Sequence, residues 1–179
     1  SRTRSRVYDG LNRLVQEVGA ADQTTMHGYD GSGNRLASTD PLGHTTTSTY
    51  DALNRLLTVT DPGNGVTRYA YDASGNLASV TDARNLVTTY GFDGLGNAVT
   101  QVSPDTGTTT RAFDAAGNVK TSTDARGAKA TTTYDAAGRV TRVIYSRTGF
   151  TSETHTFQWD GGTTGAPNAK GRLTQVTDP

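Results

Sequence analysis

The sequence predicts an all-β fold, in which tandem 21-residue repeats, each a strand-turn-strand unit, form one continuous coiled antiparallel sheet. The first observation is a pair, an aromatic residue followed by Asp, that recurs every 21 residues for seven copies, with an eighth copy 25 residues further on. The second is that short runs rich in Thr, Val and Leu fill the intervals. The pairs are Tyr8-Asp9, Tyr29-Asp30, Tyr50-Asp51, Tyr71-Asp72, Phe92-Asp93, Phe113-Asp114, Tyr134-Asp135 and Trp159-Asp160.

Each of the first seven pairs begins a tight turn. The third residue after the Asp is Asn or Gly, the types that most readily adopt a positive φ: Asn12, Gly33, Asn54, Gly75, Gly96, Gly117 and Gly138. Asp at the first position and a left-handed residue at the fourth are typical of a type I turn that joins hairpin strands. We expect each Asp carboxylate to cap N–H groups of its own turn. The next residue is always Arg or Asn: Arg13, Asn34, Arg55, Asn76, Asn97, Asn118 and Arg139.

A second turn divides each unit into a leading strand and a return strand. After Tyr50, for example, a leading run at 56–60 is followed by a turn at 61–64 and a return run at 66–71. Tyr69 and Tyr71 lie two residues apart and therefore share a face. Leu77 and Val80 have opposite parity, so either a β-bulge re-aims one of them or both faces are partly covered.

The number of units predicts the architecture. About eight units give roughly sixteen strands, and at ~4.8 Å per strand a flat sheet would be about 75 Å wide. So wide a sheet is expected to coil into a spiral or open tube, the arc of a hollow shell. A propeller and a β-solenoid are the rival architectures, although a propeller blade needs about twice this repeat length.

We expect residues 1–179 to form a single array that is a fragment of a larger protein. The regular spacing of the repeats is interrupted twice near the end of the chain. Both breaks predict loop insertions on the surface, near 146–152 and 161–169.

Composition excludes several classes of function. Lys and Arg balance Asp and Glu at 17 each, so no basic surface for nucleic acid is expected, and the arginines of residues 1–6 are assigned to a solvated strand. No apolar run approaches a membrane span, and cysteine is absent. No signal peptide is visible.

The sequence also gives no catalytic, cofactor or metal site. His27, His44 and His155 have no common spacing, and no nucleophile-elbow motif is present. A calcium loop at 30–34 is the nearest candidate, but Arg35 and Pro41 stand where Gly and Glu are required. We therefore assign the Asp residues to turns and expect no enzyme.

The repeated motifs resemble the YD repeats of Rhs proteins. The resemblance rests on the Tyr-Asp-x-x-Gly-Asn/Arg-Leu turn, the Thr-Asp-Pro-x-Gly turn and the Thr-rich return strand, and it covers essentially the whole chain. Such repeats also occur in insecticidal toxin-complex C subunits, wall-associated proteins and teneurins. The family's aspartyl autoprotease segment has no match, because its Asp-Pro-x-Gly-Leu box corresponds here only to an ordinary repeat turn at 40–43.

The resemblance implies a structural shell segment that encapsulates a C-terminal toxin or effector domain, in an exported protein, secreted or at the cell surface. The expected partners are the remaining repeats and the effector, with glycans or self-association through sheet edges as further partners, and no nucleic acid or membrane. An extracellular adhesion or carbohydrate-binding module is the alternative. We expect the repeated rings to stack between neighbouring units, so that Tyr71→Ala is costly and Arg55→Ala matters little.

Overall fold

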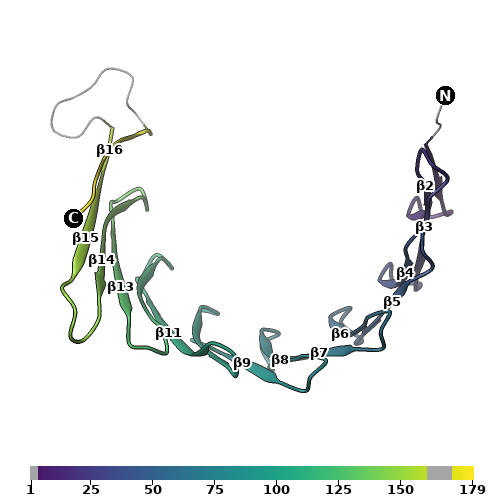
Figure 1. Cartoon of the computed structure of the whole chain (residues 1–179), viewed down its shortest axis with the longest axis horizontal. Helices are drawn as coiled ribbons and strands as arrows, with labels where there is room; N and C mark the ends of the chain where they lie inside the picture. The colour runs from purple at the N-terminus through teal and green to yellow at the C-terminus, as the bar shows by residue number, and fades with distance from the viewer. Residues whose placement is uncertain (1–3, 161–170) are drawn as a thin grey trace. The chain divides into compact units, whose positions relative to one another are not determined.

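The computed structural model describes residues 4–160 and 171–179, and all of its regular structure in this part is β-strand. Sixteen strands follow one another in chain order in one antiparallel sheet (Figure 1). The predicted all-β array of tandem strand-turn-strand units is confirmed. The described part contains no helix that is long and apolar enough to cross a membrane.

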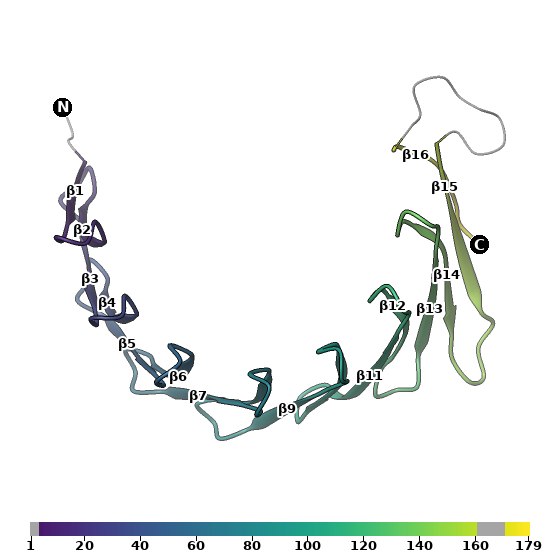
Figure 2. The same ribbon diagram turned by 180° about the vertical axis from the view of Figure 1, so that it is seen from behind.

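The chain divides into two compact units, of which the first spans Ser1–Val87. Its strands pair as successive hairpins, and their order can be followed from both sides in Figures 1 and 2. The strands are β1 (Ser5–Tyr8), β2 (Leu14–Val18), β3 (Thr24–Tyr29), β4 (Arg35–Thr39), β5 (Thr45–Tyr50), β6 (Leu56–Thr60), β7 (Val66–Tyr71) and β8 (Leu77–Thr81).

The second unit spans Thr88–Pro179 and repeats the same pattern. Its strands are β9 (Val87–Phe92), β10 (Ala98–Ser103), β11 (Gly107–Phe113), β12 (Val119–Thr123), β13 (Lys129–Tyr134), β14 (Val140–Ser146), β15 (Glu153–Trp159) and β16 (Leu173–Thr177). That residues 1–179 behave as one array, and that the chain is part of a larger protein, stay predictions.

Both kinds of turn have the geometry that the sequence predicts. In the turn after Tyr50, the Asp51 N–H donates to Arg55 O at 2.9 Å and the Asn54 N–H donates to Asp51 O at 3.0 Å. Asn54 has a φ of 61°, so the fourth residue is left-handed. The second turn of the same unit repeats both bonds between Asp61, Asn64 and Gly65.

A β-bulge follows every aromatic-Asp turn and explains the parity problem of the leading strands. Tyr71 pairs with Leu77 and Ala70 pairs with Ser79, so Ala78 is the extra residue. Because of this bulge, Leu77 and Val80 lie on the same face, where Val80 pairs with Tyr69. The structure thus selects the bulge that the sequence left as one of two alternatives.

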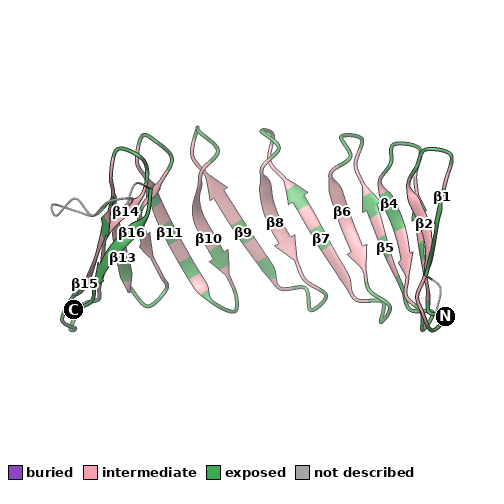
Figure 3. Ribbon diagram, turned by 90° about the horizontal axis from the view of Figure 1, so that it is seen from above, coloured by how far each residue is buried: buried purple, intermediate pink, exposed green. Residues whose placement is uncertain are grey.

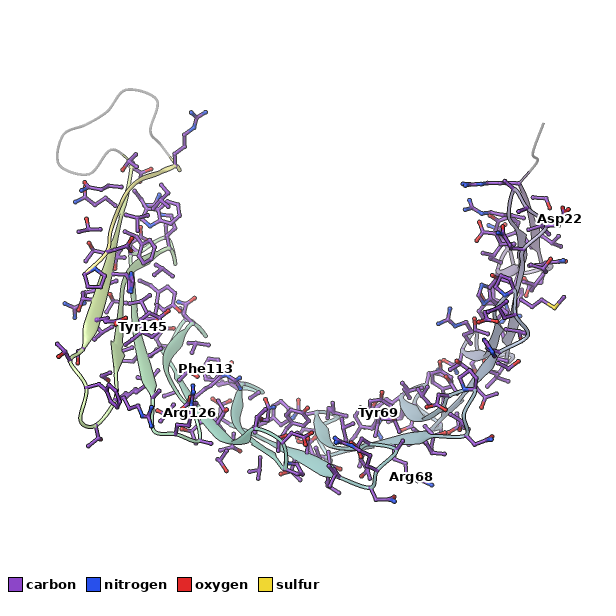
Figure 4. The ribbon with its side chains drawn as sticks, in the orientation of Figure 1. Asp22, Arg68, Tyr69, Phe113, Arg126 and Tyr145 are labelled. Carbon is purple, nitrogen blue, oxygen red and sulfur yellow. The ribbon has the colours of Figure 1, made fainter. Side chains whose placement is uncertain are left out.

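The bulges sort the side chains into two faces. The ring face carries the aromatic residue that ends each return strand. The threonine face carries the alternate residues of the same strands, such as Thr45, Thr47 and Thr49, and Thr49 Oγ1 lies 2.7 Å from Thr58 Oγ1 on the next strand. Figure 4 shows Arg68 and Tyr69 on opposite faces of β7.

Neither face is covered, so the sheet is a single layer. None of the described residues is classed as buried, and Figure 3 shows only intermediate and exposed residues along the strands. Stability in this part of the chain must therefore come from contacts between adjacent strands and from the turns.

The four residues added between Tyr134 and Trp159 mainly lengthen a hairpin. β14 and β15 have seven residues each, whereas β12 and β13 have five and six. The connection at 147–152 is only slightly longer than the usual one and contains Gly149 at φ 84°. The prediction of an inserted loop near 146–152 is therefore wrong in part, since most of the insertion forms strand; the insertion predicted at 161–169 lies outside the described residues.

Candidate functional site

The carboxylates of the repeated Asp residues accept hydrogen bonds within their own turns. Asp51 Oδ1 accepts hydrogen bonds from the N–H groups of Leu53 and Arg55, both at 2.9 Å. The backbone bond from Arg55 is the main cause that holds the pKa of Asp51 below its usual value, and the Arg55 side chain and the Leu53 amide add to it. Asp72 follows the same rule, with the side chain of Asn76 as the largest cause of its lowered pKa. The predicted capping role of these carboxylates is confirmed.

The turn at 30–34, considered above as a calcium loop, makes the same carboxylate hydrogen bonds. Asp30 Oδ1 accepts from the amides of Ser32 and Asn34 at 2.9 and 2.8 Å, and its Oδ2 accepts from the Asn34 side chain at 2.9 Å. In residues 4–160 and 171–179 no group of three or more His, Asp or Glu side chains could hold a metal ion.

The aromatic residues bind the preceding repeat through their polar atoms. The Tyr71 hydroxyl donates to Leu56 O at 3.0 Å, across 15 residues of sequence. Counted from one aromatic-Asp pair to the next, Leu56 belongs to the repeat that begins at Tyr50 and Tyr71 begins the following repeat, so each such bond joins two successive 21-residue repeats. The same bond is made by Tyr29 to Leu14 O, Tyr50 to Arg35 O, Tyr134 to Val119 O and, through Nε1, Trp159 to Val140 O.

Arginine at the fifth turn position makes a second connection between successive repeats. Arg55 Nε donates to Asp51 Oδ2 at 2.7 Å, and its guanidinium carbon lies 4.5 Å from the centroid of the Tyr71 ring. Such a position over an aromatic face is a cation–π contact. The side chain is therefore held by its own turn while it covers the ring of the next repeat. We call this arrangement of Arg, Asp and aromatic ring the inter-repeat clamp.

The clamp recurs wherever the fifth position is Arg. Arg13 Nε donates to Asp9 at 2.7 Å, its guanidinium carbon lies 4.8 Å from the Tyr29 ring centroid, and its Nη1 donates to Asp30 O at 2.7 Å.

Arg139 makes the third clamp, with Trp159 as its ring at 5.2 Å. Its Nη2 lies 2.8 Å from Asp160 Oδ2 and 2.7 Å from Asp135 Oδ2, and these two carboxylates raise the pKa of Arg139.

Asn at the same position keeps only part of these contacts. Asn76, Asn97 and Asn118 each donate from Nδ2 to the Asp of their own turn, at 2.9 to 3.0 Å. Asn34 also donates to Asn54 Oδ1, at 2.7 Å. The array therefore contains two kinds of junction, one with and one without a guanidinium over the next ring.

The prediction that the repeated rings stack on one another is wrong. The one ring pair in contact among the described residues is Tyr145 with His155, and neither belongs to the repeated row. The rings end alternate strands, so neighbours are about 9.6 Å apart, beyond the ~4.5–7 Å centroid distance of an aromatic pair. The expectation that Arg55→Ala matters little stays untested, but Arg55 contacts both Asp51 and Tyr71, and these contacts are a reason to expect a larger effect.

The three histidines lie on separate elements. His27 in β3 lies 3.1 Å from Ser38 Oγ, His44 lies 3.0 Å from Asp40 Oδ2, and His155 in β15 lies 2.8 Å from Asp178 Oδ1. The structure does not bring them together.

These features define a structural β-repeat array. The family model described as RHS Repeat matches residues 8–45, 29–67, 50–86, 71–109 and 113–149. These matches cover most of the sequence, so the chain belongs to the RHS repeat family. A search of curated proteins gives no match.

Solved structures share the fold. The chain is similar to the crystal structure of TcdB2-TccC3 (20% identity, TM-score 0.74) and to that of TcdB2-TccC3-Cdc42 (21%, 0.72). It is also similar to a structure of the Photorhabdus luminescens Tc holotoxin pore (20%, 0.73). Each alignment covers 98% of this chain and 10% of the other, so the chain spans about a tenth of the length of the proteins that it matches.

Proposed function

We propose that this chain is a non-enzymatic wall segment of a shell built from RHS repeats, and that the shell encloses a toxin or effector domain. The observation that carries the proposal is the single-layer sheet of each unit, with strands β2 to β7 and β10 to β15 paired on both sides and neither face covered. A paired backbone forms a continuous barrier, because it leaves no unsatisfied N–H or C=O groups along its middle.

The clamps support the same role. A sheet without a core needs other contacts that fix one repeat against the next, and the hydroxyl bonds and arginine contacts provide them. A wall segment needs no catalytic residues, because its function depends on an unbroken sheet and on the length of the repeat array.

The likeness to Tc toxin components supports the finer part of the proposal. On this proposal the partners are further repeats of the same polypeptide and the enclosed effector, and the protein is exported. Self-association through sheet edges and adhesion at a cell surface stay predictions.

Limited proteolysis of the intact polypeptide that carries these repeats tests the proposal. We expect the effector domain to survive at least about tenfold longer inside the intact protein than as an isolated domain, because a closed wall limits access. Equal cleavage rates for the enclosed and isolated domains, under conditions in which the repeats remain folded by circular dichroism, would refute containment.

A further inference from the structure

A hollow of about 410 Å³ lies between two successive aromatic-Asp turns of the second unit. One wall is the turn between β11 and β12, with Asp114, Ala116 and Asn118. The other wall is the end of β13 and the turn that follows it, with Tyr134 and Gly138. Figure 2 labels the strands that these two turns connect. We call this feature the Asn118 hollow, and it lies at a junction of two repeats that has Asn at the fifth turn position.

An arginine side chain fills the corresponding place in the inter-repeat clamp. Arg55 and Asn118 are both the fifth residue of their turns, and Tyr71 corresponds to Tyr134. The guanidinium carbon of Arg55 lies 4.5 Å from the centroid of the Tyr71 ring. A Cβ atom added to Gly75 in the next turn would lie 3.9 Å from Arg55 Nη1, whereas one added to the equivalent Gly138 would meet nothing within 4 Å. The Asn118 hollow therefore has the position of the guanidinium that this junction lacks.

The hydrogen-bond acceptors of the clamp are kept at the hollow. In the first clamp, Arg13 donates from Nε to the Asp of its own turn and from Nη1 to Asp30 O, both at 2.7 Å. The equivalent acceptors here are Asp114 Oδ2, which accepts from Asn118 Nδ2 at 3.0 Å, and Asp135 O, which accepts one turn hydrogen bond at 3.0 Å. Carboxylate and carbonyl oxygens each have two lone pairs, so both atoms can accept a further bond.

The ring at the hollow is fixed in place and has a free face. The Tyr134 hydroxyl donates to Val119 O at 2.9 Å, which holds the ring without any ligand. Guanidinium groups cover the corresponding rings of Tyr29, Tyr71 and Trp159, but in the described part of the chain none covers Tyr134. A ring that is already ordered loses little conformational entropy when a cation binds to its face.

Geometry, and not net charge, selects the ligand of this hollow. Asp114, Asp135 and Lys120 line it, and Arg139 already binds Asp135 at 2.7 Å. Lys120 is exposed, and within the described ranges its ammonium group makes no ion pair and lies over no ring. A guanidinium is planar and can lie over a ring while its N–H groups reach a carboxylate and a carbonyl at the same time, whereas an ammonium is a compact point charge.

We propose that the Asn118 hollow binds a guanidinium group supplied from outside the array, as the arginine side chain of a polypeptide partner. The guanidinium lies over the Tyr134 ring and donates to Asp114 Oδ2 and Asp135 O, the same set of contacts that Arg13 makes in its clamp. The volume is within the ~300–1,000 Å³ range of small-ligand sites. The site is independent of containment, because a wall segment with or without cargo would present it.

NMR titration of the full chain with N-acetyl-arginine amide, which mimics an arginine within a polypeptide, tests the proposal. We expect a Kd of about 1–10 mM, with shifts at Asn118, Tyr134 and Gly138. N-acetyl-citrulline amide has nearly the same shape without the charge, and N-acetyl-lysine amide has the charge without the planar group. Both should bind at least about fivefold more weakly than the arginine derivative.

Three variants locate the binding site. Asn118→Arg places the array's own guanidinium in the hollow and should weaken binding at least about tenfold, and the fold should be kept because three other repeats carry Arg at this position. Ser74→Arg is the matched control, because it adds the same side chain at an exposed turn position of the first unit and should bind as the parent does. Lys120→Ala removes a like charge and should bind at least as tightly as the parent.

Several outcomes would overturn the site. These are no saturable binding by about 50 mM, equal binding of the citrulline or lysine derivative, or undiminished binding by the Asn118→Arg variant. Shifts confined to the threonine face would also overturn it, because they would show binding elsewhere on the surface. The comparison of the three probes uses the parent chain, so it decides the question even where a variant fails to fold by circular dichroism.

Discussion

Replacement of Arg55 tests whether the inter-repeat clamp stabilises the array. The side chain makes a 2.7 Å ion pair with Asp51 and lies over the Tyr71 ring, and its side chain is only 30% exposed. An exposed or half-exposed cation–π contact contributes about 0.5–1 kcal/mol, and a surface ion pair about 0.2–1 kcal/mol. We therefore expect Arg55→Ala to lower the free energy of unfolding by about 1–2 kcal/mol.

A second substitution separates the two contacts. Arg55→Asn introduces the residue that four other repeats carry, so it should keep a hydrogen bond to Asp51 and lose only the ring contact, at about 0.5–1 kcal/mol.

Urea unfolding followed by circular dichroism measures these changes, with Arg68→Ala on the threonine face as the control. In a double-mutant cycle, Arg55→Ala and Tyr71→Ala should couple by at least about 0.5 kcal/mol. If Arg55→Ala and Arg68→Ala cost the same, and the cycle shows no coupling, the clamp does not stabilise the array.

Three further predictions concern the ring, the turn and the carboxylates. Tyr71→Phe keeps the ring and removes the bond to Leu56 O, so it should cost about 0.5–1.5 kcal/mol by urea unfolding. Tyr90→Phe is the control with no expected change, because the Tyr90 hydroxyl makes no hydrogen bond within residues 4–160 and 171–179. Gly75→Ala places a side chain on a residue at φ 88° and should cost about 1–2 kcal/mol of unfolding free energy. Gly31→Ala is the control, because Gly31 has an ordinary φ and open space around it, and it should cost less than about 0.5 kcal/mol. Equal effects of the two substitutions would argue against the left-handed turn. The folded-state pKa of the turn carboxylates is lowered, so the stability that they contribute is complete above the unfolded pKa of about 3.9 and is lost as the pH falls through their folded pKa values. The melting temperature should therefore be constant from pH 7 to about 5 and should fall below about pH 4. A melting temperature that does not fall at low pH would contradict the capping role.

The sequence predicted the parts of the fold that depend on local chemistry. Asp at the first and Gly or Asn at the fourth turn position fix a type I turn within a few residues, and this signal occurs in every unit. Strand existence followed from the runs between these turns. The bulge at Ala78 was left open because parity alone does not show which residue is extra.

The contacts between successive repeats were missed because they depend on distances across strands. A ring at the end of each return strand suggests a stack, but two strand spacings separate the rings, and an arginine covers the gap in some junctions. One signal was present in the sequence: Arg13 and Arg55 each precede an aromatic residue by 16 positions. A pocket of about 410 Å³ lined by Ala130, Tyr145 and Phe150 had no such periodic signal, because it depends on a single lengthened hairpin.

The measurement that tests the account most directly is electron cryo-microscopy of the intact polypeptide that carries these repeats. The account predicts a hollow particle whose wall is one sheet thick, with these repeats in the wall and density for the effector inside. A second protein layer packed along the ring face of these repeats, with no enclosed space, would contradict it.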